Sequence, residues 1–527
     1  MKVDAAAICR RLERMKSARS VIETEIRDCY RYTDPVRGTA FESIGTVPID
    51  GGSVAISNAA DKRADLLTDV GTESARIHAA ALMSGMVPAN SMWFGLDVPD
   101  AGDAEKQWLE DAAKAVWENI HASNFDAVAF DCMYDITIAG QFAMFVDEAD
   151  DGGYRFEQWA LANTYFSSSR NGGPVDTVIN EYPLTAEQAV MAYGEDMVSE
   201  QVRKAYAETP DQQFVFIRAI FPRHEGNGRM AKNMPIASMH IEQGTKHVCR
   251  ESGYHEMPVG VPRWKLLTGS HYALGPVYDA LPSLKTLNKA VEMVLANMDL
   301  AVAGMWIAED DGVLNPRSVR VGPRKIIIAN SVDSMKALQP AAKFDAAFLQ
   351  IDALEKQIRR VLMADQLTPK DGPAITATEA TINVELIRQQ LGPIYGRMQS
   401  EFLQWLVMRC FGIAYRAGAL GLAPPAIRRS MVSVRYVSPI ARAQRAVEVA
   451  AMDRYELSLG QAATVRPEVL DNYDWDEAER ERAELLGVPK KLTVEIEKRD
   501  EMRAQRQQAA QQAQQQQMLA GAVGAAA

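Results

Sequence analysis

Hydrophobic residues recur every three or four positions along several stretches of the chain, which is the spacing that places them on one face of an α-helix. The first stretch runs from Ile8 to Cys29 with arginine and glutamate residues between, and Thr33-Asp34-Pro35 ends it. The same periodicity predicts further helices at residues 74–86, 104–121, 277–300 and 344–365.

Other stretches alternate between apolar and polar positions, as expected for strands with one buried face. Residues 142–146 and 154–158 form a predicted hairpin, whose acidic turn lacks the ligand spacing of a calcium loop and is expected to be solvated. A short buried strand is predicted at 93–96, and sheet strands are predicted at 214–221, 237–242 and 246–252. The first half of the chain is therefore predicted to mix helices with sheet.

The helices predicted at 277–300 and 344–365 flank a compact insert. Alternating residues at 304–308 and 325–329 predict two strands in this insert, and a polar loop follows the second helix at 366–373. The middle of the chain is thus predicted to contain a helix pair with a small β-containing segment between its members.

Apolar periodicity then continues over residues 378–418. A helix of that length would span roughly 60 Å, and Gly392-Pro393 inside it predicts a kink. A helix this long is unusual in a compact domain and favours an elongated subunit or a helical assembly. The Gln-rich end of the chain, 497–518, is expected to be disordered in isolation and helical if neighbouring copies bundle it.

The length, composition and net charge of the chain indicate which classes of protein it can belong to. A chain of 527 residues provides about three to four domains, and 47% hydrophobic with 24% charged residues is typical of a soluble globular protein. A net charge of −12 argues against tight binding of nucleic acid, because phosphate binding depends on Lys and Arg. The first residues lack an apolar signal-peptide region and no run of ~18–20 apolar residues occurs, so neither membrane insertion nor secretion is expected.

The sequence carries no catalytic signature that we can identify. It contains no phosphate-binding G-x-x-x-x-G-K-[ST] loop, no G-x-S-x-G elbow and no H-E-x-x-H pair. Its five cysteines are scattered without C-x-x-C spacing, which favours reduced, buried thiols. We therefore expect no enzymatic activity, no catalytic residues, no metal and no cofactor.

Two groups of residues are candidates for metal or catalytic sites, but neither has the spacing that such a site requires. His240, His247, Cys249 and His255 lie close in sequence but match no standard zinc site. Glutamates on the long predicted helix would suit a nuclease, but they lack a D…E-x-K pattern, and a solvated or interfacial face is favoured; they are Glu379, Glu385 and Glu401.

Basic residues form two clusters against the acidic background. The first cluster lies in the insert and consists of Arg317, Arg320, Arg324 and Lys325. The second follows the long helix and consists of Arg428, Arg429, Arg435, Arg442 and Arg445. Both clusters fit solvated faces or ion pairs between subunits, and they also fit contacts to DNA or to an acidic partner.

Several short segments, taken in order, resemble the head-to-tail connecting (portal) proteins of short-tailed double-stranded DNA bacteriophages. The resemblance covers most of residues 5–450. The segments are Cys29-Tyr30-Arg31-Tyr32-Thr33-Asp34-Pro35, Gly71-Thr72-Glu73-Ser74-Ala75, Pro88 to Trp93-Phe94, Ser252-Gly253-Tyr254, Pro262-Arg263-Trp264, Gly275-Pro276-Val277 with Ala280-Leu281-Pro282, and Thr376-Ala377-Thr378-Glu379-Ala380.

This resemblance implies an α+β, elongated portal-type subunit in a ring oligomer. The implied plan has a wing, a stem of two helices with an inserted β-containing clip, a tunnel loop, a long kinked helix and a helical crown. The implied boundaries are 1–276 for the wing, 277–300 and 341–365 for the stem helices, 301–340 for the clip, 366–377 for the tunnel loop, 378–440 for the long helix and wing return, 441–500 for the crown and 501–527 for a Gln/Ala tail.

The resemblance also implies a function and partners. Twelve subunits would form a channel at one capsid vertex of the virion, through which DNA enters during packaging and leaves during ejection. The implied partners are the terminase large subunit, tail adaptor and nozzle proteins, the major capsid and scaffolding proteins, and double-stranded DNA without sequence specificity. Assembly would take place in the host cytoplasm, with no membrane involved.

Candidate contact residues follow from the same plan. Candidates for the tunnel loop and DNA channel are Gln366, Thr368, Lys370 and Asp371. Candidates for clip contacts to the motor or tail are Asp310, Asp311, Arg317, Arg320, Arg324 and Lys325. Candidates for ion pairs between subunits are Arg428, Arg429, Arg435, Arg442 and Arg445. A metal-dependent DNA-processing hydrolase and an internal scaffold or core protein remain as alternatives.

Overall fold

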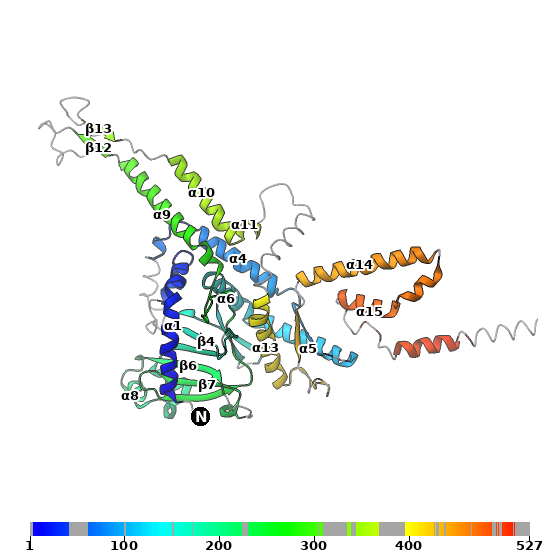
Figure 1. Ribbon diagram of the computed structural model, residues 1–527. Coiled ribbons are helices and arrows are strands. Elements are labelled where there is room, and N and C mark those ends of the chain that lie inside the picture. Colours follow the sequence, from blue (N-terminus) through cyan, green and yellow to red (C-terminus); the bar gives the residue numbers. More distant parts are fainter. Residues whose placement is uncertain are drawn as a thin grey trace, which may run out of the picture. The chain divides into compact units, whose positions relative to one another are not determined.

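The structure is a computed structural model of the chain, and Figure 1 shows its helices and strands. It describes residues 4–41, 62–99, 102–149, 152–170, 172–223, 230–303, 305–308, 335–338, 344–367, 396–425, 427, 432–436, 439–464, 466–486, 488, 492, 494, 498–509 and 511. The chain divides into two compact units. Unit 1 consists of Met1–Ala81, Val128–Phe145 and Glu157–Leu403, and unit 2 consists of Leu82–Ala127, Val146–Phe156 and Gln404–Ala527.

A long N-terminal helix and an antiparallel sheet form the core of unit 1. Helix α1 (Ala5–Arg31) starts at Asp4, whose side chain accepts a hydrogen bond from the backbone of Ala6. The sheet has the strand order β4-β5-β6-β7-β8. Its strands are β4 (Thr164–Ser167), β5 (Thr177–Thr185), β6 (Gln213–Pro222), β7 (Ile236–Glu242) and β8 (Val248–Tyr254).

Each face of this sheet packs against helix. The buried stripe of α1, which includes Leu12, packs with Ile217 and Ile241 on one face. Successive strand residues point to opposite faces, so Phe216 lies on the other face. There it packs in a cluster with Val202, and this cluster is built by α7 (Ala186–Tyr193) and α8 (Glu200–Glu208).

A buried arginine ties α1 to the start of β4. Arg19 donates hydrogen bonds to the carbonyl oxygens of Leu161 and Ala162 at 2.7 and 2.8 Å, and its guanidinium lies 4.1 Å from the Tyr165 ring centroid. An ionised group without water needs such partners, because leaving it unpaired costs several kcal/mol. The position of α1 on the sheet is therefore set by hydrogen bonds as well as by apolar contacts.

A three-stranded sheet, a helix and several short elements complete this part of the structure. Strand β2 (Ala143–Glu148) lies between β3 (Tyr154–Trp159) and β9 (Val259–Gly260), which confirms the predicted hairpin. Helix α6 (Phe125–Ala139) precedes β2. The residues of α6, β2 and β3 are divided between the two units. Helix α1 ends at Arg31, just before Thr33-Asp34-Pro35 as predicted, and the short helix α2 (Pro35–Gly38), which was not predicted, follows it. The short elements are η1 (Thr39–Phe41), η2 (Leu161–Asn163), η3 (Glu195–Met197), η4 (Ala231–Asn233), β10 (Lys265–Leu266) and β11 (Ala273–Leu274).

Unit 2 is mainly helical. Strand β1 (Phe94–Asp97) pairs with β14 (Ser433–Tyr436), and the predicted helix at 104–121 is α5 (Asp103–Ala122). Buried Trp93 donates to Nε2 of His121, whose Nδ1 lies 2.8 Å from Asp126, so the predicted strand at 93–96 is anchored through polar contacts. The other elements are α13 (Gln404–Arg416), α14 (Pro439–Ala463), η8 (Pro467–Asn472) and α15 (Trp475–Leu486).

Only the second half of the single long helix predicted over 378–418 lies within the described residues. Residues 378–395, with the expected kink at Gly392-Pro393, lie outside the described residues. The described part begins at residue 396, contains the π-helical turn η6 (Gln399–Leu403) and continues as α13. In the Gln-rich end, residues 498–509 are helical, and Arg499 and Arg503 form ion pairs with Asp476. Residues 512–518 of this end lie outside the described residues.

Glu401, on η6, forms a buried ion pair rather than facing solvent or another subunit. Arg263 donates to both of its carboxylate oxygens at 2.7 and 3.0 Å, and Arg263 also donates to the carbonyl oxygen of Gly173. The sequence interpretation of Glu401 was wrong because the arginine lies 138 positions earlier and has no local pattern. Glu379 and Glu385 lie outside the described residues.

The substitution Glu401→Ala should destabilise unit 1 strongly. The guanidinium of Arg263, which is 2% exposed, would keep its charge and its carbonyl contacts but lose its carboxylate partner, a change that costs about 3–5 kcal/mol. Chemical denaturation of the purified chain measures the change in the free energy of unfolding.

Glu118→Ala is the matched control, because Glu118 pairs with Lys114 at 3.7 Å on the surface. This exposed pair should contribute less than about 1 kcal/mol. Equal effects of the two substitutions would contradict the assignment of Arg263 and Glu401 as a stabilising pair.

Candidate functional site

Two long helices of unit 1 project from the body of the unit and carry a two-stranded ribbon at their far end (Figure 1). They are α9 (Pro276–Ala303) and α10 (Phe344–Val361), which pack against each other. Strand β12 (Met305–Ala308) pairs antiparallel with β13 (Met335–Leu338). We call α9, β12, β13 and α10 the helix-pair arm; 28 residues give α9 a length of about 42 Å.

The sequence predicted both helices but extended the second one too far. Helix α10 ends at Val361, and Met363 has a positive φ of 55°, which a helix cannot contain. The short helix α11 (Ala364–Leu367) follows. Gln366 therefore lies in α11 and not in a loop, because apolar periodicity does not report a two-residue break in backbone direction.

The base of the arm packs on α4 (Val70–Met86). Gly71 of α4 determines how closely α4 approaches α9 and the end of α1. A Cβ atom at Gly71 would lie 2.7 Å from the Tyr32 carbonyl oxygen and 2.9 Å from Leu284 on α9. Any larger residue would push these segments apart. The Gly71-Thr72-Glu73-Ser74-Ala75 segment is thus a packing motif at the point where α1, α4 and α9 meet.

Two further residues of α4 reach α10. The carboxylate of Glu73 lies 3.3 Å from Arg359, and both side chains are exposed. His78 is fully buried, with Nδ1 3.0 Å from the carbonyl oxygen of Leu362, at the end of α10. Because a carbonyl oxygen only accepts hydrogen bonds, Nδ1 carries the proton, and Nε2 is buried without a hydrogen-bond partner.

Polar contacts also hold α9 at its base. Lys285 forms an ion pair with Asp28 of α1, and this hydrogen bond raises the pKa of Lys285. Asn288 donates to the carbonyl oxygen of Asp65 at 3.1 Å and accepts from the backbone of Leu67 at 2.9 Å. The first three turns of α9 are therefore fixed to the rest of unit 1.

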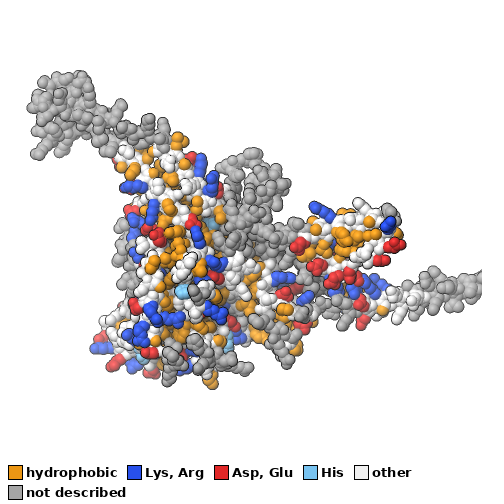
Figure 2. Space-filling view, in the orientation of Figure 1, with side chains coloured by type: hydrophobic (Ala, Val, Ile, Leu, Met, Phe, Trp, Pro, Cys, Tyr) orange, Lys and Arg blue, Asp and Glu red, His pale blue; other side chains and the backbone are white. Residues whose placement is uncertain are grey.

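Burial of apolar side chains decreases along the arm. Near the base, Leu284, Leu287, Ile358 and Leu362 are buried. Farther out, large apolar side chains on both helices are 45–71% exposed, and Figure 2 shows hydrophobic side chains on the visible face of the arm. The exposed residues are Met293, Leu295 and Met298 on α9, and Phe348 and Leu349 on α10.

Phe348 is the clearest departure from the sequence pattern. It falls in register with Leu354 and Ile358, so the periodicity predicts burial, yet it is 53% exposed while those two are buried. Among the described residues, none covers this end of the stripe.

Most of the predicted contact residues lie outside the described part of the chain. These are Asp310, Asp311, Arg317, Arg320, Arg324 and Lys325 of the insert, Thr368, Lys370 and Asp371 after α11, and Arg428 and Arg429. The predicted strand at 325–329 also lies outside it, and the described partner of β12 is β13 instead.

Three residues of the second basic cluster are placed within unit 2. Arg435 lies on β14 opposite Gly95 of β1, and Arg442 and Arg445 lie on α14. The structure therefore distributes this cluster over a strand and a helix. Their assignment to ion pairs between subunits stays a prediction.

The described ranges show no group of three or more His, Cys, Asp or Glu residues that could hold a metal ion. Nδ1 of His240 instead lies 3.0 and 3.1 Å from the hydroxyl oxygens of Tyr182 and Tyr193, and burial lowers its pKa to about 3. The five cysteines are free; Cys9 is half-buried and the others are buried. Among the described helices none is long and apolar enough to cross a membrane.

The sequence reasoning missed the anchoring residues of the arm. No sequence motif indicates that His78, Glu73 and Lys285 have partners more than 200 positions away in the chain. One sequence feature could have indicated a close contact between helices. It is Gly71-Thr72-Glu73, a glycine followed by polar residues at the start of a helix rich in small side chains.

His78 should make the chain sensitive to mild acid. Burial lowers its pKa from 6.5 to about 4, so below pH 6.5 the unfolded chain takes up a proton that the folded chain does not. Between pH 7 and pH 5 this linkage should lower the free energy of unfolding by about 2 kcal/mol. Denaturation curves at the two pH values measure it.

The variant His78→Asn keeps a donor toward Leu362 but removes the titrating group, so its loss of stability between pH 7 and pH 5 should be smaller. His255, which is exposed, supplies the control variant His255→Asn. If His78→Asn and His255→Asn showed the same pH dependence as the unsubstituted chain, the buried neutral state of His78 would be refuted.

Comparisons with known proteins agree with the resemblance in the sequence. The family model described as "Bacteriophage head to tail connecting protein" matches residues 5–493. The "Probable portal protein" of Bordetella phage BPP-1 is 29% identical over 481 residues, covering 86% of this chain and 84% of that protein. The "Portal protein" of Salmonella phage epsilon15 is 26% identical over 521 residues, covering 95% of this chain and 90% of that protein.

Solved structures of two gene transfer agent assemblies are also similar. A chain from the neck of an empty particle gives a TM-score of 0.37 at 14% identity, covering 79% of this chain and 94% of that chain. A chain from a native virion gives a TM-score of 0.33 at 14% identity, covering 75% of this chain and 97% of that chain. Since the family model spans nearly the whole sequence, the protein belongs to the bacteriophage head-to-tail connecting protein family.

Proposed function

We propose that this connector is a portal protein whose copies form a ring through the helix-pair arm. The observation that carries the proposal is the exposed apolar end of α9 and α10, with Leu349 71% exposed. Burying such side chains gains roughly 1.5–3 kcal/mol each, and a neighbouring copy of the same arm presents the same chemistry. Repeating this contact around an axis closes a ring.

Repulsion between the negative charges of neighbouring copies opposes the formation of such a ring. Each copy carries a net charge of −12, so neighbouring copies repel one another at low ionic strength. Apolar burial along the arm and cross-subunit ion pairs would offset this repulsion. The arginines assigned to those pairs are Arg428, Arg429, Arg435, Arg442 and Arg445.

The other parts of the chain then take the roles of the portal plan. The helix pair is the stem, the segment with β12 and β13 is the clip, and α14 with α15 belongs to the crown. The tunnel loop would follow α11 and contain Thr368, Lys370 and Asp371, with Gln366 in the helix that leads into it. An acidic channel lets duplex DNA slide without sequence specificity, because few phosphate contacts retain it.

The proposed assembly is a dodecamer at a single capsid vertex. It connects to the major capsid and scaffolding proteins, to the terminase large subunit during packaging, and afterwards to tail adaptor and nozzle proteins. DNA would pass inward in packaging and outward in ejection, with assembly in the host cytoplasm. The family match gives no support to a metal-dependent hydrolase or to an internal scaffold protein.

Leu349→Glu, alone or with Phe348→Glu, should prevent ring formation. A carboxylate at this position would have to lose its hydration in the contact between neighbouring arms. Light scattering and electron microscopy of the concentrated protein should show rings of about 700 kDa for twelve unsubstituted chains of 58.1 kDa, and single chains for the variant.

Met191→Glu is the control, since Met191 is 79% exposed on α7, away from the arm. It should leave ring formation intact. Rings of normal size and stability from the Leu349→Glu variant, at the same concentration, would refute the arm as the contact between copies.

The double variant Arg317→Ala, Arg320→Ala should weaken docking of the packaging motor while rings still form. Loss of two cationic groups from the clip should lower the affinity for the terminase large subunit roughly tenfold, with a reduced dependence on salt. Surface-immobilised rings and purified motor protein provide the measurement. The control pair Lys204→Ala, Lys232→Ala removes the same charge elsewhere, and equal binding by both double variants would refute the clip assignment.

A further inference from the structure

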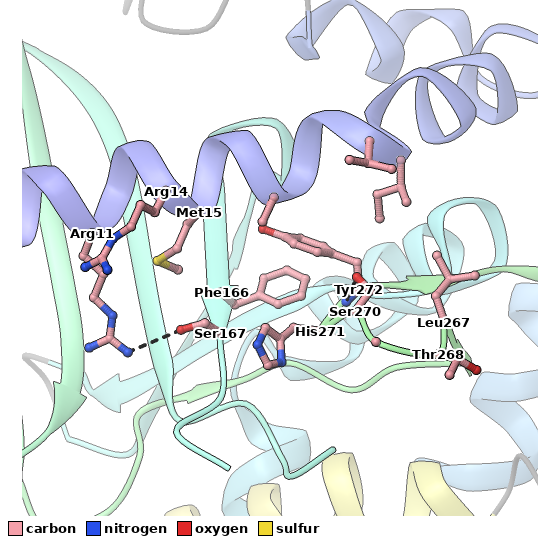
Figure 3. A pocket seen from close by; sticks show the side chains of 14 residues that line it. Arg11, Arg14, Met15, Phe166, Ser167, Leu267, Thr268, Ser270, His271 and Tyr272 are labelled. Carbon is pink, nitrogen blue, oxygen red and sulfur yellow. Dashed lines mark hydrogen bonds between the residues drawn. The ribbon is translucent and has the colours of Figure 1, made fainter. Parts of the chain in front are cut away.

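Unit 1 contains a groove that the proposed function does not use. It lies between α1 and the turn that joins β10 to β11, and its volume is about 740 Å³ (Figure 3). That volume falls in the range of sites that hold a small ligand or a few side chains of a peptide. We call it the α1 groove.

The floor of the α1 groove is formed mainly by large buried side chains. Met15, Ile22, Phe166 and Tyr272 are buried side chains that line it. The rings of Phe166 and Tyr272 lie against each other with their centroids 4.4 Å apart. At the rim, Val21 is 79% exposed, so an apolar occupant would find further apolar surface there.

One end of the groove is positively charged. Arg11 and Arg14 project from α1 at the same end of it (Figure 3). Arg11 is held by hydrogen bonds to Thr177 at 3.0 Å and Ser167 at 3.4 Å, while Arg14 is exposed. Burial lowers the pKa of Arg11, Asp176 opposes this, and the neighbouring charge of Arg14 lowers it further.

The described residues that line the groove include no aspartate or glutamate. The positive end therefore has no carboxylate inside the groove. An occupant that places a carboxylate at Arg14 gains a charge-assisted hydrogen bond. An occupant that is only an anion would leave the apolar floor uncovered.

We propose that the α1 groove docks a short peptide segment of a partner protein, in which one or two carboxylates adjoin large apolar side chains. The carboxylates lie at Arg11 and Arg14, and the apolar side chains cover Phe166, Tyr272 and Val21. Duplex DNA offers phosphates but no apolar side chains, so it matches only one end of the groove. This docking site is separate from the arm and does not depend on ring formation.

Selection from a library of displayed twelve-residue peptides tests the proposal, with the full-length protein as the target. Enriched peptides should combine Asp or Glu with Leu, Phe or Trp. A synthetic enriched peptide carrying a fluorophore should bind the unsubstituted chain, and its affinity should fall at least about tenfold for Arg14→Glu and for Val21→Asp. Both substituted positions are exposed, so the variants should fold normally.

Arg10→Glu is the matched control, because Arg10 is exposed on the same helix but does not line the groove. It should leave peptide affinity within about twofold. Enriched peptides without carboxylates, or equal binding by all three variants, would overturn the proposal.

Two other outcomes would replace the proposed occupant. If double-stranded DNA displaced the peptide and Val21→Asp had no effect, the groove would be an anion site and the peptide proposal would be wrong. If Val21→Asp and Arg14→Glu abolished ring formation, the occupant would be a second copy of this chain. Normal rings that lose only peptide binding would support the proposal and leave the proposed function intact.

Discussion

Close packing of α4 against α9 at Gly71 is the contact on which the helix-pair arm depends. With no side chain at this position, α9 approaches α4 and the end of α1 closely enough for Lys285 to reach Asp28. On the next turns of α4, Glu73 and His78 then reach Arg359 and the end of α10. One glycine thus allows α4 to hold both α9 and α10 at the base of the arm.

Buried arginines perform a similar task elsewhere in the two units. Arg19 joins α1 to the sheet, Arg263 joins the segment after β9 to η6, and in unit 2 Arg409 donates to the carbonyl oxygen of Val146. Each guanidinium has several partners in a fixed plane, so it specifies an orientation that apolar contacts alone would leave loose. The acidic chain therefore uses several of its cations internally.

Sequence patterns predicted elements whose burial depends on local periodicity. Helices α1, α5, α9 and most of α10, and strands β6, β7 and β8, follow such patterns. Strands β4 and β5 were missed because Asn180, Glu181 and Pro183 interrupt the alternation in β5. The partner of Glu401, the break at Met363 and the exposure of Phe348 could not be predicted, since none of them is set by local periodicity. The resemblance to connectors added an expected order of wing, stem, clip and crown, which periodicity alone does not predict.

The decrease in burial along the arm has a kinetic consequence. The base can form as soon as one chain folds, whereas a two-stranded ribbon such as β12 with β13 is marginally stable alone. Local opening should therefore be frequent at the outer end of the arm and rare at its base. In the proposed ring other copies cover this exposed apolar tip, so in a newly made chain the rate of encounter between copies would compete with non-specific aggregation. Cellular concentration and timing of synthesis then decide how much of the protein reaches its functional form.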